Sequence, residues 1–459
     1  MREAADVPAA RVAARVSGER VEALSERSES STTWVNPDGS LTSELFAGPR
    51  WVRRGEEWVE VDVTLQKASD GTVVSRAHPK GLRLGGRGGA RPASMKAARS
   101  APARDLVTLG QGDDAVTLRW KGGLPEPVLS GARATYPQAV PGADVVVEAT
   151  RTGFEQFVVL KERPAATDWS YTLPLVVRGV KARKASDGGV EFVDRRTGKV
   201  RAVMPAPVMW DASGEAGSGR SVRQVPAAMA VSQKGSSIEL TVTPDAGFLA
   251  DPATVYPVTV DPSTTGLWMV SDTFIKPNDT SGRTGATSLE WGTNPAGVTM
   301  KAAQTFMTWY TEPVADALVT DAKLSLWNYN SGNTADCKSR GWSVYPADKT
   351  AWSSVLWADR PVPVEGAYAT SYETRGGAGC TADGWINADL TELVQVWASA
   401  RNTNSPMMIK AGAESDTTYF KQLNSSDAAT NVPKLTVTYN YRPRTGTAQE
   451  AGPPFVKDA

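Results

Sequence analysis

The chain has 459 residues, more than the ~100 to 200 of a usual single domain, so two or three compact units are expected. Lys plus Arg and Asp plus Glu are both 50, and this balance argues against nucleic acid or anionic lipid as a partner. A single histidine, His78, and two cysteines leave little for catalysis that needs an imidazole, or for a zinc site. The sequence predicts no membrane span, and its first residues lack the apolar stretch of an export signal.

The first half of the chain is predicted to be rich in short strands. Residues 1–30 have four aliphatic side chains at helical spacing, which bury little area, so this segment is predicted to be helical or disordered. A turn at residues 36–39 separates two strand patterns, at 33–35 and 41–46. Similar patterns, spaced by about 8 to 12 residues, continue toward residue 264. We therefore predict a β-rich domain at residues 31–264.

Residues 67–104 interrupt this pattern with nine basic side chains, one acidic side chain and a cluster of glycines. Such a segment can bind RNA or acidic glycans, but no aromatic residue is interleaved for stacking. The sequence therefore favours a solvated surface loop, with His78 inside it.

The second half of the chain has a different composition. Nine of the 15 tryptophans and both cysteines lie between residues 265 and 440. We predict a separate β-sandwich, jelly-roll-like, at residues 265–440, and a linker-like tail at 441–459. The whole chain is predicted to be all-β.

Five sequence blocks in this second half carry a resemblance. They are SDTFI at 271–275, AKLSLW at 322–327, the tryptophans at 352 and 357 with a proline at 361, ADLT at 388–391, and PKLTVTY at 433–439. In this order they resemble a DNRLRE-type domain, which is related to carbohydrate-binding module family 96. The resemblance implies a β-sandwich that binds polysaccharide.

The first half carries a second resemblance. WVNPDGS at 34–40, YP at 136–137 with PGAD at 141–144, and YPVTVDP at 256–262 are similar to the β-rich segment of large exported actinobacterial proteins. Some of those proteins carry Rhs-type repeats or laminin-G-like domains. This resemblance implies a secreted or cell-surface protein, whose sequence here is a fragment or has a misassigned start.

Cys337 and Cys380 flank one segment of the predicted sandwich. If the protein is exported, a single pair of cysteines within one domain predicts a disulfide. The alternative is two unpaired thiols. A redox site is disfavoured because the cysteines lack C-x-x-C spacing.

The strand pattern at residues 322–329 provides the candidate ligand-binding residues. Ala322, Leu324 and Leu326 are expected to face the core, and Lys323, Trp327 and Tyr329 the other side. Exposed aromatic rings offer flat surfaces on which sugar rings stack. In the alternative interpretation, a crossing loop covers both aromatic residues, because Trp is usually buried.

Four other tryptophans, Trp352, Trp357, Trp385 and Trp397, are predicted to support the fold. Trp352 and Trp357 lead into Asp359 and Arg360, whose charges orient a structural loop. Trp397 lies on a predicted helix at residues 390–400, whose apolar residues recur at helical spacing.

The sequence indicates no cofactor and no metal centre. Asp272, Asn278 and Asp279 could supply oxygen ligands for a structural calcium ion, but no EF-hand spacing accompanies them. No P-loop and no G-x-S-x-G pattern is present.

Three functional hypotheses follow. The first is a non-catalytic exported or surface protein that binds polysaccharide or cell-wall glycan through its C-terminal sandwich. The second is a structural stalk or shell segment of a larger exported Rhs-type assembly. The third is a polysaccharide lyase or hydrolase, which rests only on abundant acidic residues, Tyr and Lys.

Overall fold

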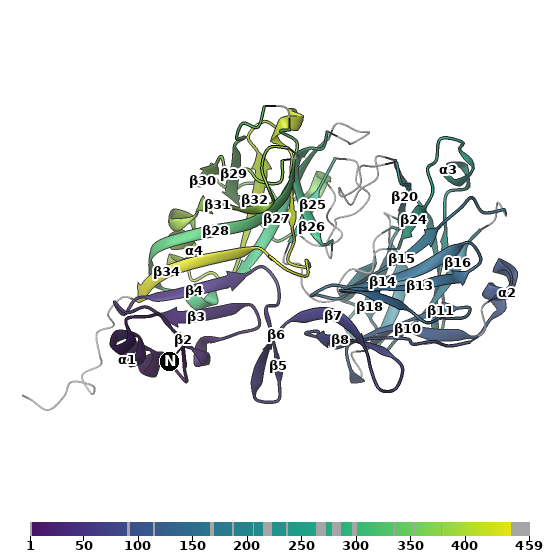
Figure 1. The fold of residues 1–459 in the computed structure, drawn as a ribbon, viewed down its shortest axis with the longest axis horizontal. Helices are drawn as coiled ribbons and strands as arrows, with labels where there is room; N and C mark the ends of the chain where they lie inside the picture. Colours follow the sequence, from purple (N-terminus) through teal and green to yellow (C-terminus); the bar gives the residue numbers. More distant parts are fainter. Residues whose placement is uncertain are drawn as a thin grey trace, which may run out of the picture.

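The computed structural model describes most of the chain, and every structural statement below refers to the described residues. These are residues 2–89, 92–112, 115–165, 169–185, 188–204, 206–213, 223–235, 237–262, 272–277, 286–295, 301–334, 336–351, 355, 357–377 and 379–441. Strands dominate, in two bodies that lie side by side (Figure 1). The predicted all-β class is confirmed. No helix of the described part is long and apolar enough to cross a membrane.

The first body combines the C-terminal part of the chain with its first strands. Its described strands form one curled sheet that folds back on itself as a sandwich (Figure 1). In the order in which neighbouring strands pair, these are β1 (Glu3–Ala4), β2 (Val21–Ala23), β3 (Ser31–Val35), β4 (Leu41–Phe46), β34 (Lys434–Tyr441), β28 (Ala317–Ser331), β33 (Lys421–Asn424), β26 (Ser288–Thr293), β27 (Ala302–Tyr310), β32 (Asn404–Ala411), β29 (Trp342–Pro346) and β30 (Ala369–Ser371). In addition, β25 (Asp272–Ile275) pairs with β27, and β31 (Gly384–Asp389) pairs with β28.

Large aromatic side chains fill the space between the two layers of this sandwich. Trp291, Trp309 and Trp342 are each 0% exposed and belong to one apolar cluster with strand and helix residues. The predicted helix is present as α4 (Thr391–Ser399), which buries Leu393, Val394 and Trp397. Most of the tryptophans described in this body therefore lie in its core or pack against it.

The first 46 residues do not follow the predicted division into domains. Helix α1 (Val7–Ser17) is capped by the Asp6 side chain and ends at Gly18, where φ is +70°, so the first segment is an ordered helix followed by strands. The predicted hairpin at residues 31–46 is present as β3 and β4. However, β4 pairs with β34 of the C-terminal sheet rather than with strands of the predicted 31–264 unit. A hydrogen bond between the hydroxyls of Ser43 and Tyr439, 3.0 Å apart, joins these strands inside the core.

The second body is a sandwich of two larger sheets. One contains β22 (Ala228–Lys234), β23 (Ser237–Thr243), β16 (Tyr171–Val177), β11 (Val116–Lys121), β10 (Ala103–Leu109), β9 (Leu82–Leu84), β8 (Val73–Ala77) and β7 (Asp62–Lys67). The other contains β12 (Val128–Ser130), β13 (Arg133–Val140), β14 (Ala143–Ala149), β15 (Phe154–Leu160), β24 (Val258–Asp261), β20 (Val208–Trp210) and β21 (Gln224–Pro226). One apolar cluster draws residues from both sheets.

Smaller elements complete this body and the connections. They are β5 (Trp51–Arg54) with β6 (Glu57–Glu60), the sheet of β17 (Val180–Lys184), β18 (Val190–Asp194) and β19 (Val200–Met204), the helices α2 (Met95–Ser100) and α3 (Ala246–Ala250), and the short 3-10 turns Leu24–Glu26, Glu312–Val314, Trp357–Asp359 and Thr417–Tyr419. The predicted boundary at residue 264 lies outside the described residues. The predicted tail at 441–459 also lies outside them, apart from its first residue.

The basic segment at residues 67–104 is not a surface loop. It contributes β8, β9 and α2, and Val73, Leu82 and Leu84 are buried in the core of the second body. Their apolar side chains alternate with polar ones, a strand period that the high density of arginine and glycine obscured. His78 is also buried, 4% exposed, with its Nε2 2.9 Å from the carbonyl oxygen of Thr150. Burial lowers the pKa of His78 to about 4.

A buried polar junction joins the two bodies. Arg151, which follows β14, donates from Nε to the carbonyl of Ala428 and from Nη2 to the carbonyl of Ala429, both at 3.0 Å. Its Nη1 donates to the carbonyl of Pro49 at 3.1 Å. The next residue, Thr152, donates from its backbone N–H and its hydroxyl to Oδ1 of Asp427, at 2.9 and 2.7 Å. These bonds connect a turn of the second body to the β33–β34 connection of the first.

Two buried carboxyl groups lie at this junction. Asp272 accepts hydrogen bonds from the backbone N–H of Ser426 at 2.6 Å and from its hydroxyl at 2.8 Å. Burial, reinforced by the charge of Asp427, raises the pKa of Asp272 to about 7. Burial also raises the pKa of Asp427.

The raised pKa of Asp272 predicts a pH-dependent stability. Its ordinary value is 3.8, so between about pH 4 and about pH 7 the folded protein holds a proton that the unfolded chain releases. The contribution of Asp272 to stability therefore falls as the pH rises through this window. The variant Asp272→Asn keeps a neutral group at this position at every pH. When the pH is raised from about 5 to about 8, we expect its free energy of unfolding to fall by a few kcal/mol less than that of the wild type. Urea unfolding at both pH values measures this. Because His78 is common to both proteins, its opposite contribution cancels, and equal losses would contradict the prediction.

Candidate functional site

The predicted alternation along β28 is observed as far as Trp327. Ala322, Leu324 and Leu326 are buried in the sandwich core. Lys323 is exposed and Trp327 is half-buried. Because successive side chains of a strand point to opposite faces, Lys323 and Trp327 lie on the outer face of the sheet.

A second tryptophan accompanies Trp327 on this face. Trp385, on β31, lies directly across the ladder from Trp327, and the ring centroids are 5.5 Å apart in an edge-to-face arrangement. The Nζ of Lys434, on β34, lies 5.7 Å from the Trp385 ring. Both indoles are half-buried, so each presents part of its surface to solvent.

Polar groups surround this pair. The hydroxyl of Ser325 donates to Oδ1 of Asn387 at 2.8 Å, and the Nδ2 of Asn387 donates to Oε2 of Glu373 at 3.0 Å. Lys434 forms an ion pair with Glu44, with 3.5 Å between Nζ and Oε1. Aromatic surface bordered by hydroxyl, amide and carboxylate groups can stack on a sugar ring and hydrogen-bond its hydroxyls.

Tyr329 does not follow the alternation that was expected to place it on the outer face beside Trp327. The register of β28 with β33 shifts between Asn328 and Asn330, so a β-bulge interrupts the alternation at Tyr329. A chain segment crosses there: a Cβ added to Gly376 would be 2.2 Å from the carbonyl carbon of Tyr329. Tyr329 is half-buried, and the crossing segment agrees with the alternative interpretation for this residue.

Of the tryptophans predicted to support the fold, Trp357 and Trp397 lie away from this face. Trp357 packs against a small cluster that contains Ile275 and Phe306, and the Arg360 guanidinium lies 4.0 Å from its ring centroid. Trp397 is 3% exposed, on α4. Trp352 lies outside the described residues, as do Asn278 and Asp279 of the calcium hypothesis.

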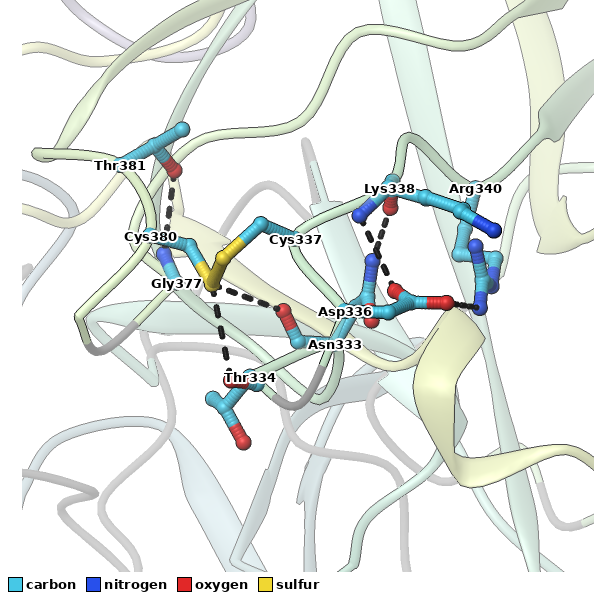
Figure 2. Close-up of a disulfide and its surroundings, with 9 residues drawn as sticks. All are labelled: Asn333, Thr334, Asp336, Cys337, Lys338, Arg340, Gly377, Cys380 and Thr381. Atoms are coloured by element: carbon cyan, nitrogen blue, oxygen red, sulfur yellow. Dashed lines mark hydrogen bonds and ion pairs between the residues drawn. A yellow bond between two sulfur atoms is a disulfide. The ribbon is translucent and has the colours of Figure 1, made fainter.

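The predicted disulfide is present. Cys337 and Cys380 join two loops, and Figure 2 shows the Asp336–Arg340 ion pair next to it, at 2.9 Å. The Sγ of Cys380 lies 3.7 Å from the carbonyl oxygen of Asn333. The hydrogen bond from the Lys338 backbone N–H and the Arg340 pair lower the pKa of Asp336 to about 2. Among the described residues, no group of three or more His, Cys, Asp or Glu side chains is placed to hold a metal ion.

The sequence did not single out Trp385 and Lys434 as ligand-binding candidates, and it assigned Trp385 to fold support, whereas the structure places it half-buried beside Trp327. A signal for Trp385 was available, because Trp385, Asn387 and Asp389 alternate with the buried Ile386 and Ala388. No local signal places Lys434 beside Trp385, because that depends on which strands pair.

Comparisons with known proteins add two findings. Residues 263–439 match the family model of Carbohydrate-binding module family 96, which supports a carbohydrate-binding-module-related C-terminal domain. The chain is also 22% identical over 437 residues to the tRNA nuclease WapA of Bacillus subtilis (strain 168), covering 91% of this chain and 18% of that protein. It is 25% identical over 315 residues to the tRNA(Glu)-specific nuclease WapA of Bacillus subtilis subsp. natto, covering 66% and 13%. It is 23% identical over 437 residues to the tRNA3(Ser)-specific nuclease WapA of Bacillus spizizenii, covering 91% and 18%. The chain thus spans less than a fifth of the length of these relatives.

These relatives correct one expectation. The sequence predicted a protein without catalytic activity, and the names of the relatives, which are nucleases, contradict that prediction. The same names count against the expectation that excluded nucleic acid as a partner. The resemblance of the first half to Rhs-associated proteins stays a prediction.

Proposed function

We propose that this chain binds a polysaccharide through the outer face of β28, β31 and β34. The match of residues 263–439 to a carbohydrate-binding module family is the observation that carries the proposal. The half-buried Trp327–Trp385 pair, 5.5 Å between centroids, supports this placement within the matched region. Trp327 and Trp385 supply the stacking surface, and Lys323, Asn387 and Lys434 supply hydrogen bonds to sugar hydroxyls. Tyr329 has a smaller role because the crossing segment lies against its backbone.

The proposal includes action outside the cytoplasm. The Cys337–Cys380 disulfide supports an oxidising compartment, since such bonds are rare in reducing cytosol. Cell-wall or other extracellular glycan is then the polysaccharide within reach.

Substitution of Trp327 tests the proposed site. In affinity electrophoresis of the full chain against a panel of soluble polysaccharides, we expect Trp327→Ala to weaken binding about tenfold, because one stacking surface is lost. Trp210→Ala is the matched control, since Trp210 is also a half-buried tryptophan and lies on β20 in the other body. Retention by no polysaccharide of the panel, or equal retention of wild type and Trp327→Ala, would refute the proposal.

A second candidate function is participation in tRNA cleavage. The observation that favours it is that two tRNA nucleases align with 91% of this chain. Incubation of the chain with total tRNA, followed by denaturing gel electrophoresis, tests it. Discrete cleavage fragments support the candidate, and intact tRNA at protein concentrations equal to that of the tRNA argues against it. The stalk and polysaccharide-cleaving hypotheses stay predictions.

A further inference from the structure

The face that holds Trp327 continues onto the first strands of the chain. In the ladders, β31 pairs with β28, β28 with β34, and β34 with β4. Lys434 lies opposite Phe46 of β4, so these two side chains share the outer face, while Leu435 and Leu45 share the inner one. Phe46 is only 8% exposed, so it supports this face from beneath its neighbours. Phe46 lies well outside the residues that match the carbohydrate-binding family.

Aromatic rings and cations alternate beyond Phe46. The Arg50 guanidinium lies 5.3 Å from the Phe46 ring and 5.8 Å from the Trp51 ring. The Arg27 guanidinium lies 4.3 Å from the Trp51 ring. The indole N–H of Trp51 donates to the hydroxyl of Thr32 on β3 at 2.8 Å, which fixes this tryptophan over the sheet. Trp51 remains half-buried.

A continuous series of contacts and strand pairings therefore crosses the outer face. We name it the outer strip, and its members are Trp327, Trp385, Lys434, Phe46, Arg50, Trp51 and Arg27. Two separate parts of the sequence, residues 27–51 and 327–434, build it. It is longer than a surface for a single sugar ring, because neighbouring strands are ~4.8 Å apart and it crosses several of them.

Each of the three cations of the outer strip is paired with a carboxylate. Arg50 pairs with Glu60 at 2.6 Å and Lys434 with Glu44 at 3.5 Å, and both cations are partly exposed. Arg27 pairs with Glu22 at 2.7 Å, and these two side chains are only 9% and 8% exposed, so this pair is buried beneath the surface. A polyanion gains affinity chiefly from cations that replace its counterions. Cations already paired with carboxylates offer little of this gain, and the carboxylates repel a polyanion. The paired charges of the outer strip thus match an uncharged, hydroxyl-rich chain better than RNA or an acidic glycan, and Lys323 is left as a hydrogen-bond donor to hydroxyls beside Trp327.

We propose that the outer strip is one composite binding site for an uncharged polysaccharide, with Trp51 and its neighbours forming its second half. The inference rests on the proposed glycan binding. It adds that the ligand is uncharged and that residues 27–51, at the start of the chain, form part of the binding site. The paired arginines act by holding Phe46 and Trp51 in place, and sugar rings contact the half-buried indoles of Trp327, Trp385 and Trp51.

Binding of the full chain to uncharged and anionic polymers tests both the charge class of the ligand and the contribution of residues 27–51. The probes are hydroxyethylcellulose, xyloglucan, polygalacturonate and poly(U), in affinity electrophoresis at low and high salt. We expect binding to at least one uncharged polymer that is insensitive to salt, and about a tenfold weakening by either Trp385→Ala or Trp51→Ala. Trp210→Ala is the control, because Trp210 is a half-buried tryptophan of β20 in the other body. Circular dichroism and thermal unfolding identify any variant that fails to fold, and Trp51→Phe, which keeps a ring, is then expected to retain most of the affinity.

The outcomes separate the inference from the proposed function. Weakening by Trp385→Ala but not by Trp51→Ala overturns the composite site and leaves glycan binding in place. Preferential, salt-sensitive binding of polygalacturonate overturns the charge class alone. Binding of poly(U) only, or of no polymer, overturns both the inference and the proposed function.

Discussion

Arg151→Ala is expected to lower the free energy of unfolding by about 3 kcal/mol or more. Arg151 is 2% exposed, and its guanidinium donates to three carbonyl oxygens that belong to Pro49, Ala428 and Ala429. Truncation leaves those carbonyls without donors and removes a positive charge close to the buried Asp427. Because these bonds join the two bodies, we also expect the single variant to separate their unfolding into two transitions.

Urea unfolding followed by tryptophan fluorescence and by far-UV circular dichroism measures both effects. Arg133→Ala is the control, since Arg133 is an exposed arginine whose ion pair with Glu148, at 3.5 Å, lies on the surface of β13 and β14. Arg151→Lys keeps the charge but cannot donate in three directions, so an intermediate loss is expected. An unfolding curve of Arg151→Ala that superimposes on the wild type would show that the junction contributes nothing.

Removal of the disulfide is the second large effect. Cys337 and Cys380 are 43 positions apart, so the bond restricts the unfolded chain by about 4 kcal/mol in the chain-entropy estimate. We expect the double variant Cys337→Ser, Cys380→Ser to unfold at a correspondingly lower urea concentration. Both loops belong to the C-terminal sandwich, so the lost stability comes from that body.

A reducing agent provides the internal control for this measurement. Dithiothreitol should lower the stability of the wild type to that of the double variant and leave the variant unchanged. If the double variant and the wild type unfold alike under oxidising conditions, the entropic argument is wrong for this loop.

Local patterns predicted much of the fold. Alternation of apolar and polar residues located β28 and placed Trp327 on its outer face, because strand period depends only on neighbouring residues. The helical spacing that buries Leu393, Val394 and Trp397 located α4 in the same way. The disulfide was predicted because the sequence has only two cysteines and both lie in one predicted domain of a protein expected to be exported.

Features that depend on distant partners were not predictable in this way. The pairing of β4 with β34 has no local signature, so residues 31–46 were assigned to the neighbouring unit. The position of Tyr329 depends on a bulge opposite β33, and that of Lys434 on the strands at both of its edges. The strands of the segment at 67–104 were hidden because its charge and glycine content resemble those of a loop.

The pairing of β4 with β34 also constrains the order of assembly. Ser43 and Tyr439 are 396 positions apart, so during synthesis the early hairpin is made long before the strand that covers its edge. Until then, β4 presents an unpaired backbone edge, which is a template for association with other chains. A chain that ends before Lys434 would keep this edge permanently open. This edge is therefore covered only once the chain has been made as far as β34.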